Sequence, residues 1–262
     1  MLRITRIDEE PFHSLAYRTS GPSGTPLRQR LPFYRAYATG LPDAMKALVF
    51  ASDLQGREQG GENRLMGEAV AEALADLVQG SVIPQPEAVL LCGDLYDYPD
   101  CHKRGGTGPV DEVFRAFARM ASQVIGVLGN HDELTDPKSL PRNVQVLDGK
   151  TKTVGKLVVG GVSGIVGEPG RHQRRTEHSY LSVMERVTSG RPDLLLLHQE
   201  PDDPERNRRG DPGVALSLAT GYRGLTVFGH SHWGWPWLIP MGDGQALNVD
   251  GRVVILMRED EP

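Results

Sequence analysis

The sequence predicts an α/β fold with four layers, in which two mixed β-sheets pack face to face and helices cover their outer surfaces. From residue 47 onward, apolar strand-like runs alternate with amphipathic helical segments, which indicates βα units. The last part of the chain is instead rich in short strand-like runs. Mixed βα units followed by a return to β-structure favour two packed sheets over one open sheet.

Each element is expected from its own periodicity and its flanking residues. The strands are expected at 47–52, 87–92, 123–128, 144–147, 151–154, 157–162, 193–198, 225–229, 235–239, 245–249 and 253–257. The helices are expected at 64–79, 109–122, 177–188 and 212–220. In the first helix, Asn63 is expected to cap the start and Gly80 the end.

Residues 1–45 differ from the rest because prolines interrupt them repeatedly. We expect an N-terminal extension over 1–45 that packs on the core, and a main domain over 46–262. Within the extension, alternation at 2–7 predicts an edge strand, and residues 12–17 predict a second strand.

Composition limits the choice of partners. The 262 residues include 29 basic and 34 acidic side chains, a net charge of -5, so net charge does not indicate a nucleic-acid partner, although local basic patches stay open. No run reaches the roughly 20 apolar residues needed to span a membrane. Charged residues within 1–10 argue against a signal peptide, so a cytoplasmic protein with reduced Cys92 and Cys101 is expected.

Several of the apolar runs end directly in residues with metal-binding side chains. These residues are Asp53, Asp94, Asn130, His131, His198, His230 and His232. In α/β sheets, ligands collect beyond the carboxyl ends of the strands, where polar side chains converge without being buried unpaired. The pattern therefore predicts one metal site built from several strand ends.

The order of these motifs resembles that of a known family. In chain order they are Asp53-Leu54-Gln55, Gly93-Asp94-Leu95-Tyr96-Asp97, Gly129-Asn130-His131-Asp132, His198 and Gly229-His230-Ser231-His232. Each piece is short, but the ordered set resembles the calcineurin-like metallophosphoesterases, which are dinuclear metal phosphoesterases. The resemblance covers residue 47 to about 257 and implies the metallo-dependent phosphatase fold, a four-layer αββα sandwich.

The resemblance also implies a ligand set for two divalent ions. The first ion would be held by Asp53, Asp94 and His232, with Gln55 where the family usually has histidine. The second would be held by Asp94, Asn130, His198 and His230, so that Asp94 bridges the pair. If the amide oxygen of Gln55 coordinates, this harder donor favours Mn²⁺, with Fe, Zn, Ni and Mg as alternatives. If it does not, that position is filled by water or empty.

The activity implied by the resemblance is hydrolysis of a phosphate ester by in-line attack of a metal-bridging hydroxide. In this scheme His131 is not a ligand but donates a proton to the leaving alkoxide or stabilises the leaving side. Asp97 would orient the His131 ring, and Asp132 is expected to have a structural role.

The substrate is a phosphoester whose type the sequence leaves open. A phosphodiesterase is favoured because we expect no large cap domain that would enclose a small monoester, and because exposed arginine loops could accommodate a bulky leaving group. The alternatives are a phosphomonoesterase or nucleotide phosphatase, a nuclease, and a catalytically silent metal-binding scaffold. The candidate substrate contacts are Arg171, Arg174, Arg175 and Tyr96, whereas Trp233, Trp235 and Trp237 either stack on a base or pack in the protein. The oligomeric state stays open.

Overall fold

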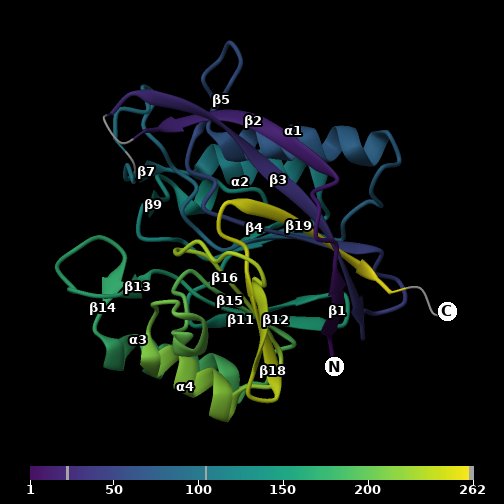
Figure 1. Cartoon of the computed structure of the whole chain (residues 1–262), viewed down its shortest axis with the longest axis vertical. Coiled ribbons are helices and arrows are strands. Elements are labelled where there is room, and N and C mark those ends of the chain that lie inside the picture. Colours follow the sequence, from purple (N-terminus) through teal and green to yellow (C-terminus); the bar gives the residue numbers. More distant parts are fainter. Residues whose placement is uncertain (22–23, 104, 260–262) are drawn as a thin grey trace.

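The computed structural model describes residues 1–21, 24–103 and 105–259. Its helices are α1 (Met66–Gln79), α2 (Asp111–Met120), α3 (Glu177–Ser189) and α4 (Pro212–Gly221), with short 3-10 turns at Pro137–Ser139 and Pro204–Arg206. Figure 1 shows α1 and α2 at the top, α3 and α4 at the bottom, and the sheets between them. The predicted four-layer αββα architecture is therefore confirmed.

The larger sheet has the strand order β10-β8-β6-β4-β19-β3-β2-β5, and β1 pairs with β3 at its side. Its strands are β1 (Arg3–Ile7), β2 (His13–Ser20), β3 (Pro26–Thr39), β4 (Ala47–Ser52), β5 (Arg57–Glu58), β6 (Ala88–Leu91), β8 (Gln123–Gly126), β10 (Val144–Val146) and β19 (Arg252–Arg258). The neighbouring strands β4, β6 and β8 run parallel, so their carboxyl ends reach the same edge.

The smaller sheet has the order β11-β12-β15-β16-β18-β17. Its strands are β11 (Lys150–Val154), β12 (Leu157–Val162), β15 (Leu194–Leu197), β16 (Leu225–Phe228), β17 (Leu238–Met241) and β18 (Gly244–Asn248). Two minor pairs join β7 (Gly108–Pro109) to β9 (Asp132–Glu133) and β13 (Ile165–Val166) to β14 (Arg174–Arg175). Strands β15, β16 and β18 are mutually parallel, so this sheet also presents several carboxyl ends together.

The central strands of the larger sheet are buried on both faces. In β4, Leu48 and Phe50 belong to the core between the two sheets, whereas Val49 and Ala51 belong to the core beneath α1 and α2. Successive side chains of a strand point to opposite faces, so an uninterrupted apolar run can serve both cores. This is why the strands that lead to the metal-binding residues read as continuous apolar runs rather than as alternating ones.

Helix α1 begins slightly later than expected. Its N-cap is Leu65, whose backbone N–H donates to the Glu68 carboxylate at 3.1 Å. The expected cap Asn63 has a φ of 56° and instead donates its side-chain amide to the Pro99 carbonyl at 2.8 Å. The assignment of Asn63 was therefore wrong, whereas Gly80 does end the helix, as its N–H donates to the Asp76 carbonyl.

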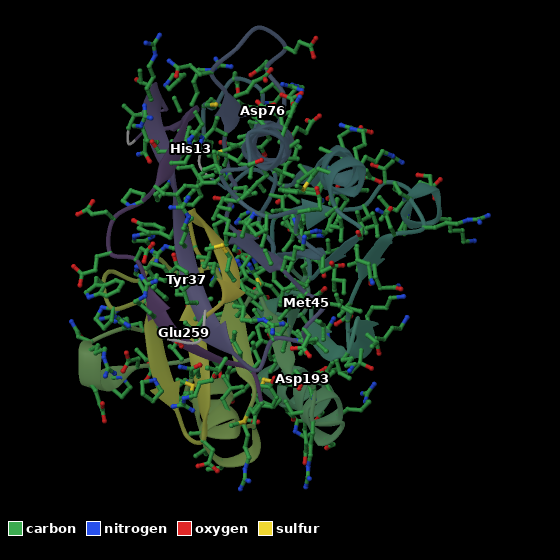
Figure 2. All side chains as sticks on the ribbon, turned by 90° about the vertical axis from the view of Figure 1, so that its right-hand side faces the viewer. His13, Tyr37, Met45, Asp76, Asp193 and Glu259 are labelled. Carbon is green, nitrogen blue, oxygen red and sulfur yellow. The ribbon has the colours of Figure 1, made fainter. Side chains whose placement is uncertain are left out.

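Residues 1–45 contribute strands β1 to β3 to the larger sheet. The expected strands at 2–7 and 12–17 correspond to β1 and β2, but β3 was not expected. Its outer half, which contains Pro26 and Pro32, pairs with β2 alone, because the ladder with β19 begins only at Phe33. Proline is tolerated where one side of a strand is unpaired. Figure 2 shows His13 on β2 and Tyr37 on β3 along the same side of the molecule.

Among the described residues, no helix combines the length and the apolar character needed to cross a membrane. Both cysteines are buried and neither is in a disulfide.

Candidate metal centre and substrate cleft

Asp94 lies at the middle of the residues that follow the strand ends. It comes after β6, where Gly93 and Asp94 both have a positive φ, of 90° and 54°. This turn directs a buried carboxylate across the sheet edge. Its Oδ1 accepts the backbone N–H of His131 at 3.0 Å, and its Oδ2 accepts the side-chain amide of Gln55 at 2.9 Å.

Asp94, His198 and His230 bring their donor atoms together. One donor atom from each residue lies within 4.8 Å of the others, and the two imidazole rings are 5.0 Å apart. His198 Nδ1 is 2.7 Å from the Cys92 carbonyl oxygen, which can only accept, so Nδ1 carries a proton. His198 Nε2 therefore points toward Asp94 Oδ1, at 3.3 Å. Such a histidine, oriented through its other nitrogen, has the usual arrangement of a metal ligand.

The pKa values of Asp94, His198 and His230 are shifted by burial and by one another's charges. Burial alone would lower the pKa of His198, but the Asp94 carboxylate outweighs it and raises that pKa to about 10. Burial likewise favours neutral Asp94, yet the His198 charge holds the Asp94 pKa below its usual value. Burial and then the His198 charge lower the pKa of His230 to about 4, which leaves a neutral imidazole. Asp94 and His198 thus each favour the charged form of the other, so this position is one where a buried carboxylate faces positive charge.

Among the expected metal ligands, two buried side-chain atoms have no hydrogen-bond partner in the described part of the chain. They are Asn130 Oδ1 and His198 Nε2, the latter being close to Asp94 but misaligned for a hydrogen bond. A buried polar atom without a partner costs about 1–3 kcal/mol, so its retention requires an explanation. A divalent ion held by Asp94, Asn130, His198 and His230 would satisfy both atoms. The residues present therefore fit one metal ion at this position.

Two glycines are required by the close approach of these carboxylates. A Cβ on Gly129 would lie 2.0 Å from Asp94 Oδ1, and a Cβ on Gly229 would lie 2.2 Å from Asp53 Oδ2. No side chain fits at such distances. The glycines of the Gly-Asn-His and Gly-His-x-His motifs thus allow the loops to pass directly over the two aspartates.

The other expected ligand set is arranged differently. Asp53 has a φ of 53°, and its Oδ2 accepts hydrogen bonds from the Ser52 hydroxyl at 2.7 Å and the His230 backbone N–H at 2.9 Å. Burial, followed by the Asp250 charge, raises the pKa of Asp53 well above its usual value. Gln55 directs its nitrogen, not its oxygen, at Asp94. This set shares Asp94 with the buried set but does not converge as tightly.

His232 is the most exposed of the expected ligands, with 65% of its side chain accessible. Its Nδ1 is 3.0 Å from Asp250 Oδ1, and Arg252 Nη2 lies 3.3 Å from each ring nitrogen. Sequence reasoning missed Asp250 and Arg252. Asp250 follows β18 just as the other ligands follow their strands, so the same rule could have found it. Arg252 has no such signal, because it begins β19 instead of following a strand.

His131 faces the open side of the centre. It is half-buried, its Nδ1 is 3.4 Å from the Thr107 hydroxyl, and burial lowers its pKa. The buried Asp97 accepts the backbone N–H of Tyr98 at 2.8 Å. Its orienting role toward His131 stays a prediction.

Asp132 is fully buried. Within the described residues, the hydrogen bonds of its carboxylate all come from backbone N–H groups. It accepts the N–H groups of Asp94, Leu95 and Gly129 at 2.7, 2.7 and 2.9 Å. One carboxylate thereby ties together two motif loops, in agreement with the expected structural role.

The expected metal ligands open into a cleft of about 1390 Å³. Asp53, Gln55, Asp94, His131 and His230 line its floor, together with His232. Of the expected substrate contacts, Arg171 lines the cleft. Arg175 instead pairs with Asp148 at 2.6 Å, Arg174 lies on β14 close enough to lower the pKa of His131, and Tyr96 stacks edge-on against Tyr98.

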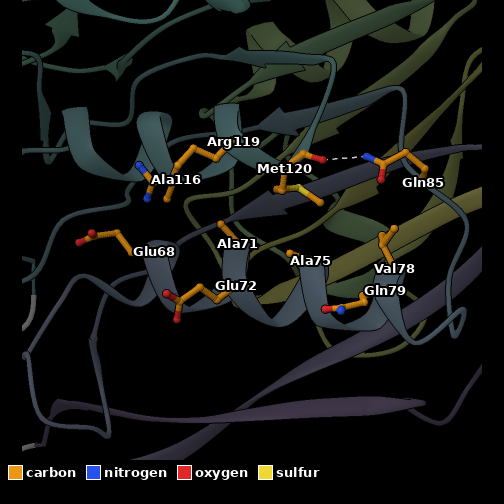
Figure 3. A pocket seen from close by; sticks show the side chains of 10 residues that line it. All are labelled: Glu68, Ala71, Glu72, Ala75, Val78, Gln79, Gln85, Ala116, Arg119 and Met120. Atoms are coloured by element: carbon orange, nitrogen blue, oxygen red, sulfur yellow. Dashed lines mark hydrogen bonds between the residues drawn. The ribbon is translucent and has the colours of Figure 1, made fainter.

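A second, smaller hollow of about 380 Å³ lies between α1 and α2. Figure 3 shows side chains from both helices around it, with Gln85 donating a hydrogen bond to the Met120 carbonyl at 2.7 Å. None of its lining residues belongs to the motifs, so the large cleft is the candidate functional site.

The comparisons with known proteins agree with this geometry. The family model described as calcineurin-like phosphoesterase matches residues 47–234. The chain belongs to this family. Membership of this family supports a metal-dependent hydrolase that acts on phosphoesters. The family also implies divalent metal ions, and Asp94, His198 and His230 form a group that could hold one. The chain has no significant match among curated protein sequences.

One solved structure shares the fold of this calcineurin-like phosphoesterase, and two further ones have lower similarity. Protein TT1561 of Thermus thermophilus is 16% identical, with a TM-score of 0.53 over 78% of this chain and 88% of that one. The phosphopantetheinyl hydrolase of Mycobacterium tuberculosis is 16% identical, with a TM-score of 0.44 over 80% and 90%. Protein AQ665 of Aquifex aeolicus, of unknown function, is also 16% identical, with a TM-score of 0.37 over 80% and 95%.

Proposed function

We propose that this protein is a phosphodiesterase that uses divalent metal ions, with Mn²⁺ as the preferred ion. The observation that carries the preference for diesters is the size of the cleft, about 1390 Å³, which begins at the metal-binding residues. Pockets for compact ligands usually measure about 300–1,000 Å³. A cleft of this size accommodates ester groups on both sides of a phosphorus atom.

One ion would be held by Asp94, Asn130, His198 and His230, and the other by Asp53, Asp94 and His232, with Gln55 beside them. Bound there, the ions would lower the pKa of a water molecule and neutralise charge on the phosphate. Oxygen donors from Asp53, Asp94 and Asn130 make up much of the set, which supports Mn²⁺ over a softer ion.

The protein's own residues supply the remaining steps. His131 faces the cleft and donates a proton to the oxygen of the leaving group, which otherwise departs as a poorly stabilised alkoxide. Asp97 orients His131 and stabilises its protonated form. Asp132 holds the loops that carry Asp94 and Asn130 at a fixed separation.

The proposal is tested with bis(4-nitrophenyl) phosphate and 4-nitrophenyl phosphate in the presence of Mn²⁺. These substrates share a leaving group and differ in the second ester. We expect a higher kcat/KM for the diester. A higher kcat/KM for the monoester would indicate a phosphomonoesterase instead. If metal-loaded protein hydrolyses neither substrate, the result would favour a catalytically silent metal-binding scaffold.

A further inference from the structure

The cleft extends beyond the metal centre to two regions that are far apart in sequence. One is the hairpin of β2 and β3, which contributes side chains to one wall. The other is the loop 233–237 between β16 and β17, which also lines the cleft. The hairpin side chains are Tyr17, Thr19, Gln29, Arg30, Pro32 and Tyr34. The family match begins at residue 47, so this wall lies outside the segment common to the family.

Three aromatic rings follow one another from the hairpin to the loop. Tyr34 and Trp237 have ring centroids 5.1 Å apart, and Trp237 and Trp235 are 5.8 Å apart in an edge-to-face arrangement. Trp237 is only 4% exposed, whereas Trp235 is 55% exposed. The inner two rings therefore form a fixed support, and the outermost indole is open to the cleft.

Arg252 connects this aromatic series to the metal end of the cleft. Its guanidinium carbon lies 4.8 Å from the centre of the Trp237 ring, and its Nη2 is 3.3 Å from each ring nitrogen of His232. The residue is 3% exposed, and its Nη1 has no hydrogen-bond partner among the described residues. A single buried cation thus touches both an expected metal ligand and the aromatic support.

We propose that Trp235, backed by Trp237 and Tyr34, binds a planar aromatic group of the substrate, namely the base of a nucleoside phosphodiester. An exposed indole in the same cleft as the expected metal ligands suits a molecule with a charged end and a planar end. Bases stack on aromatic side chains, and Trp235, at 55% exposure, is the accessible large aromatic side chain of this cleft. Because polar and charged side chains line much of the cleft, a planar group with polar edges suits it better than a purely apolar one. The inference rests on the proposed phosphodiesterase function.

The test uses two diesters, 4-nitrophenyl thymidine 5′-phosphate and 4-nitrophenyl methyl phosphate. Water attacks phosphorus and releases 4-nitrophenol from both, so only the nucleoside differs. We expect the kcat/KM of the nucleoside ester to be about tenfold higher or more, since stacking of one base contributes roughly that much. Trp235→Ala should lower the kcat/KM of the nucleoside ester far more than that of the methyl ester, and Trp235→Phe should retain most of the advantage.

Leu216→Ala provides a matched control, because Leu216 is 65% exposed on α4 and does not line the cleft. It should leave both esters unchanged. Equal kcat/KM values for the two esters, unaffected by Trp235→Ala, would overturn the aromatic site while leaving the phosphodiesterase proposal intact.

A binding measurement separates the two proposals if neither ester is hydrolysed. The ligands are adenosine 5′-monophosphate and ribose 5-phosphate, and the signal is the tryptophan fluorescence of Mn²⁺-loaded protein. The adenosine compound should change this fluorescence at a lower concentration than the ribose compound does. Trp235→Ala should make the two concentrations equal. Such a result would support the aromatic site even if the proposed activity failed. Equal responses to both compounds would overturn it.

Discussion

The two expected metal positions share Asp94 but differ in how the fold holds their other ligands. His198 is fully buried and its ring is fixed by the Cys92 carbonyl, and His230 lies beside it. His232 is mostly exposed and contacts Asp250 and Arg252 instead. One position is therefore preorganised by both sheets, whereas the other lies at the mouth of the cleft.

This difference indicates how the centre can bind one ion tightly and still give the substrate access to the other. The buried position leaves the donor atoms of Asn130 and His198 unpaired, so the protein gains most from an ion there. The open position has a glutamine in place of an imidazole and an arginine beside its histidine. We expect the buried position to bind its ion first and the open position to bind more weakly, next to the substrate.

The largest effect is expected from His198→Ala, which removes a ligand from the buried position. Metal content measured by mass spectrometry should fall, and kcat should fall about a thousandfold, because a metal ion contributes several kcal/mol of transition-state stabilisation. His178→Ala is the control, since His178 is exposed on α3. Full metal content in the His198 variant would contradict the assignment of the buried position.

His131→Ala tests a residue that belongs to neither position. It should keep its metal content but lose about a hundredfold in kcat, because general acids contribute 10²–10⁴-fold. The loss should be larger for an alkyl leaving group than for 4-nitrophenol, which departs without a proton. Equal losses for both leaving groups would remove the role of proton donor.

Asp132→Asn probes the scaffold of the buried position. The amide cannot accept all three backbone N–H groups, so at least one is left buried and unpaired. The free energy of unfolding in urea should fall by about 2 kcal/mol. The exposed neighbour Glu133→Gln should change it by less than about 0.5 kcal/mol. Similar stability in both variants would show that Asp132 is dispensable.

Gln55→His tests the open position and should have the smallest effect. An added imidazole should tighten the weaker binding step for Zn²⁺ or Mn²⁺ by about tenfold in calorimetric titration, while the tighter step stays unchanged. Gln85→His, on the surface between α1 and α2, is the matched control. If Gln55→His changes the affinity of the tighter binding step instead, the open position is the one that binds its ion first.

The sequence predicted the strand ends and the motif residues because the signals are local. Each ligand follows its apolar run within a few residues, and parallel strands bring such ends to one edge. The strand β3 was missed because Pro26 and Pro32 argue against a strand, yet they are tolerated where only β2 pairs with it. Residue propensities along the sequence do not reveal which side of a strand is left without a pairing partner.

The chain by itself determined the family, the layered α/β architecture and the candidate ligands, since these depend on periodicity and on the order of short motifs. Only the tertiary structure decided which donors converge, because that depends on how loops from two sheets approach Asp94. It also joined the N-terminal hairpin, Arg252 and Trp235 into one cleft. Contacts between segments so far apart leave no local pattern, so they are specified by packing alone.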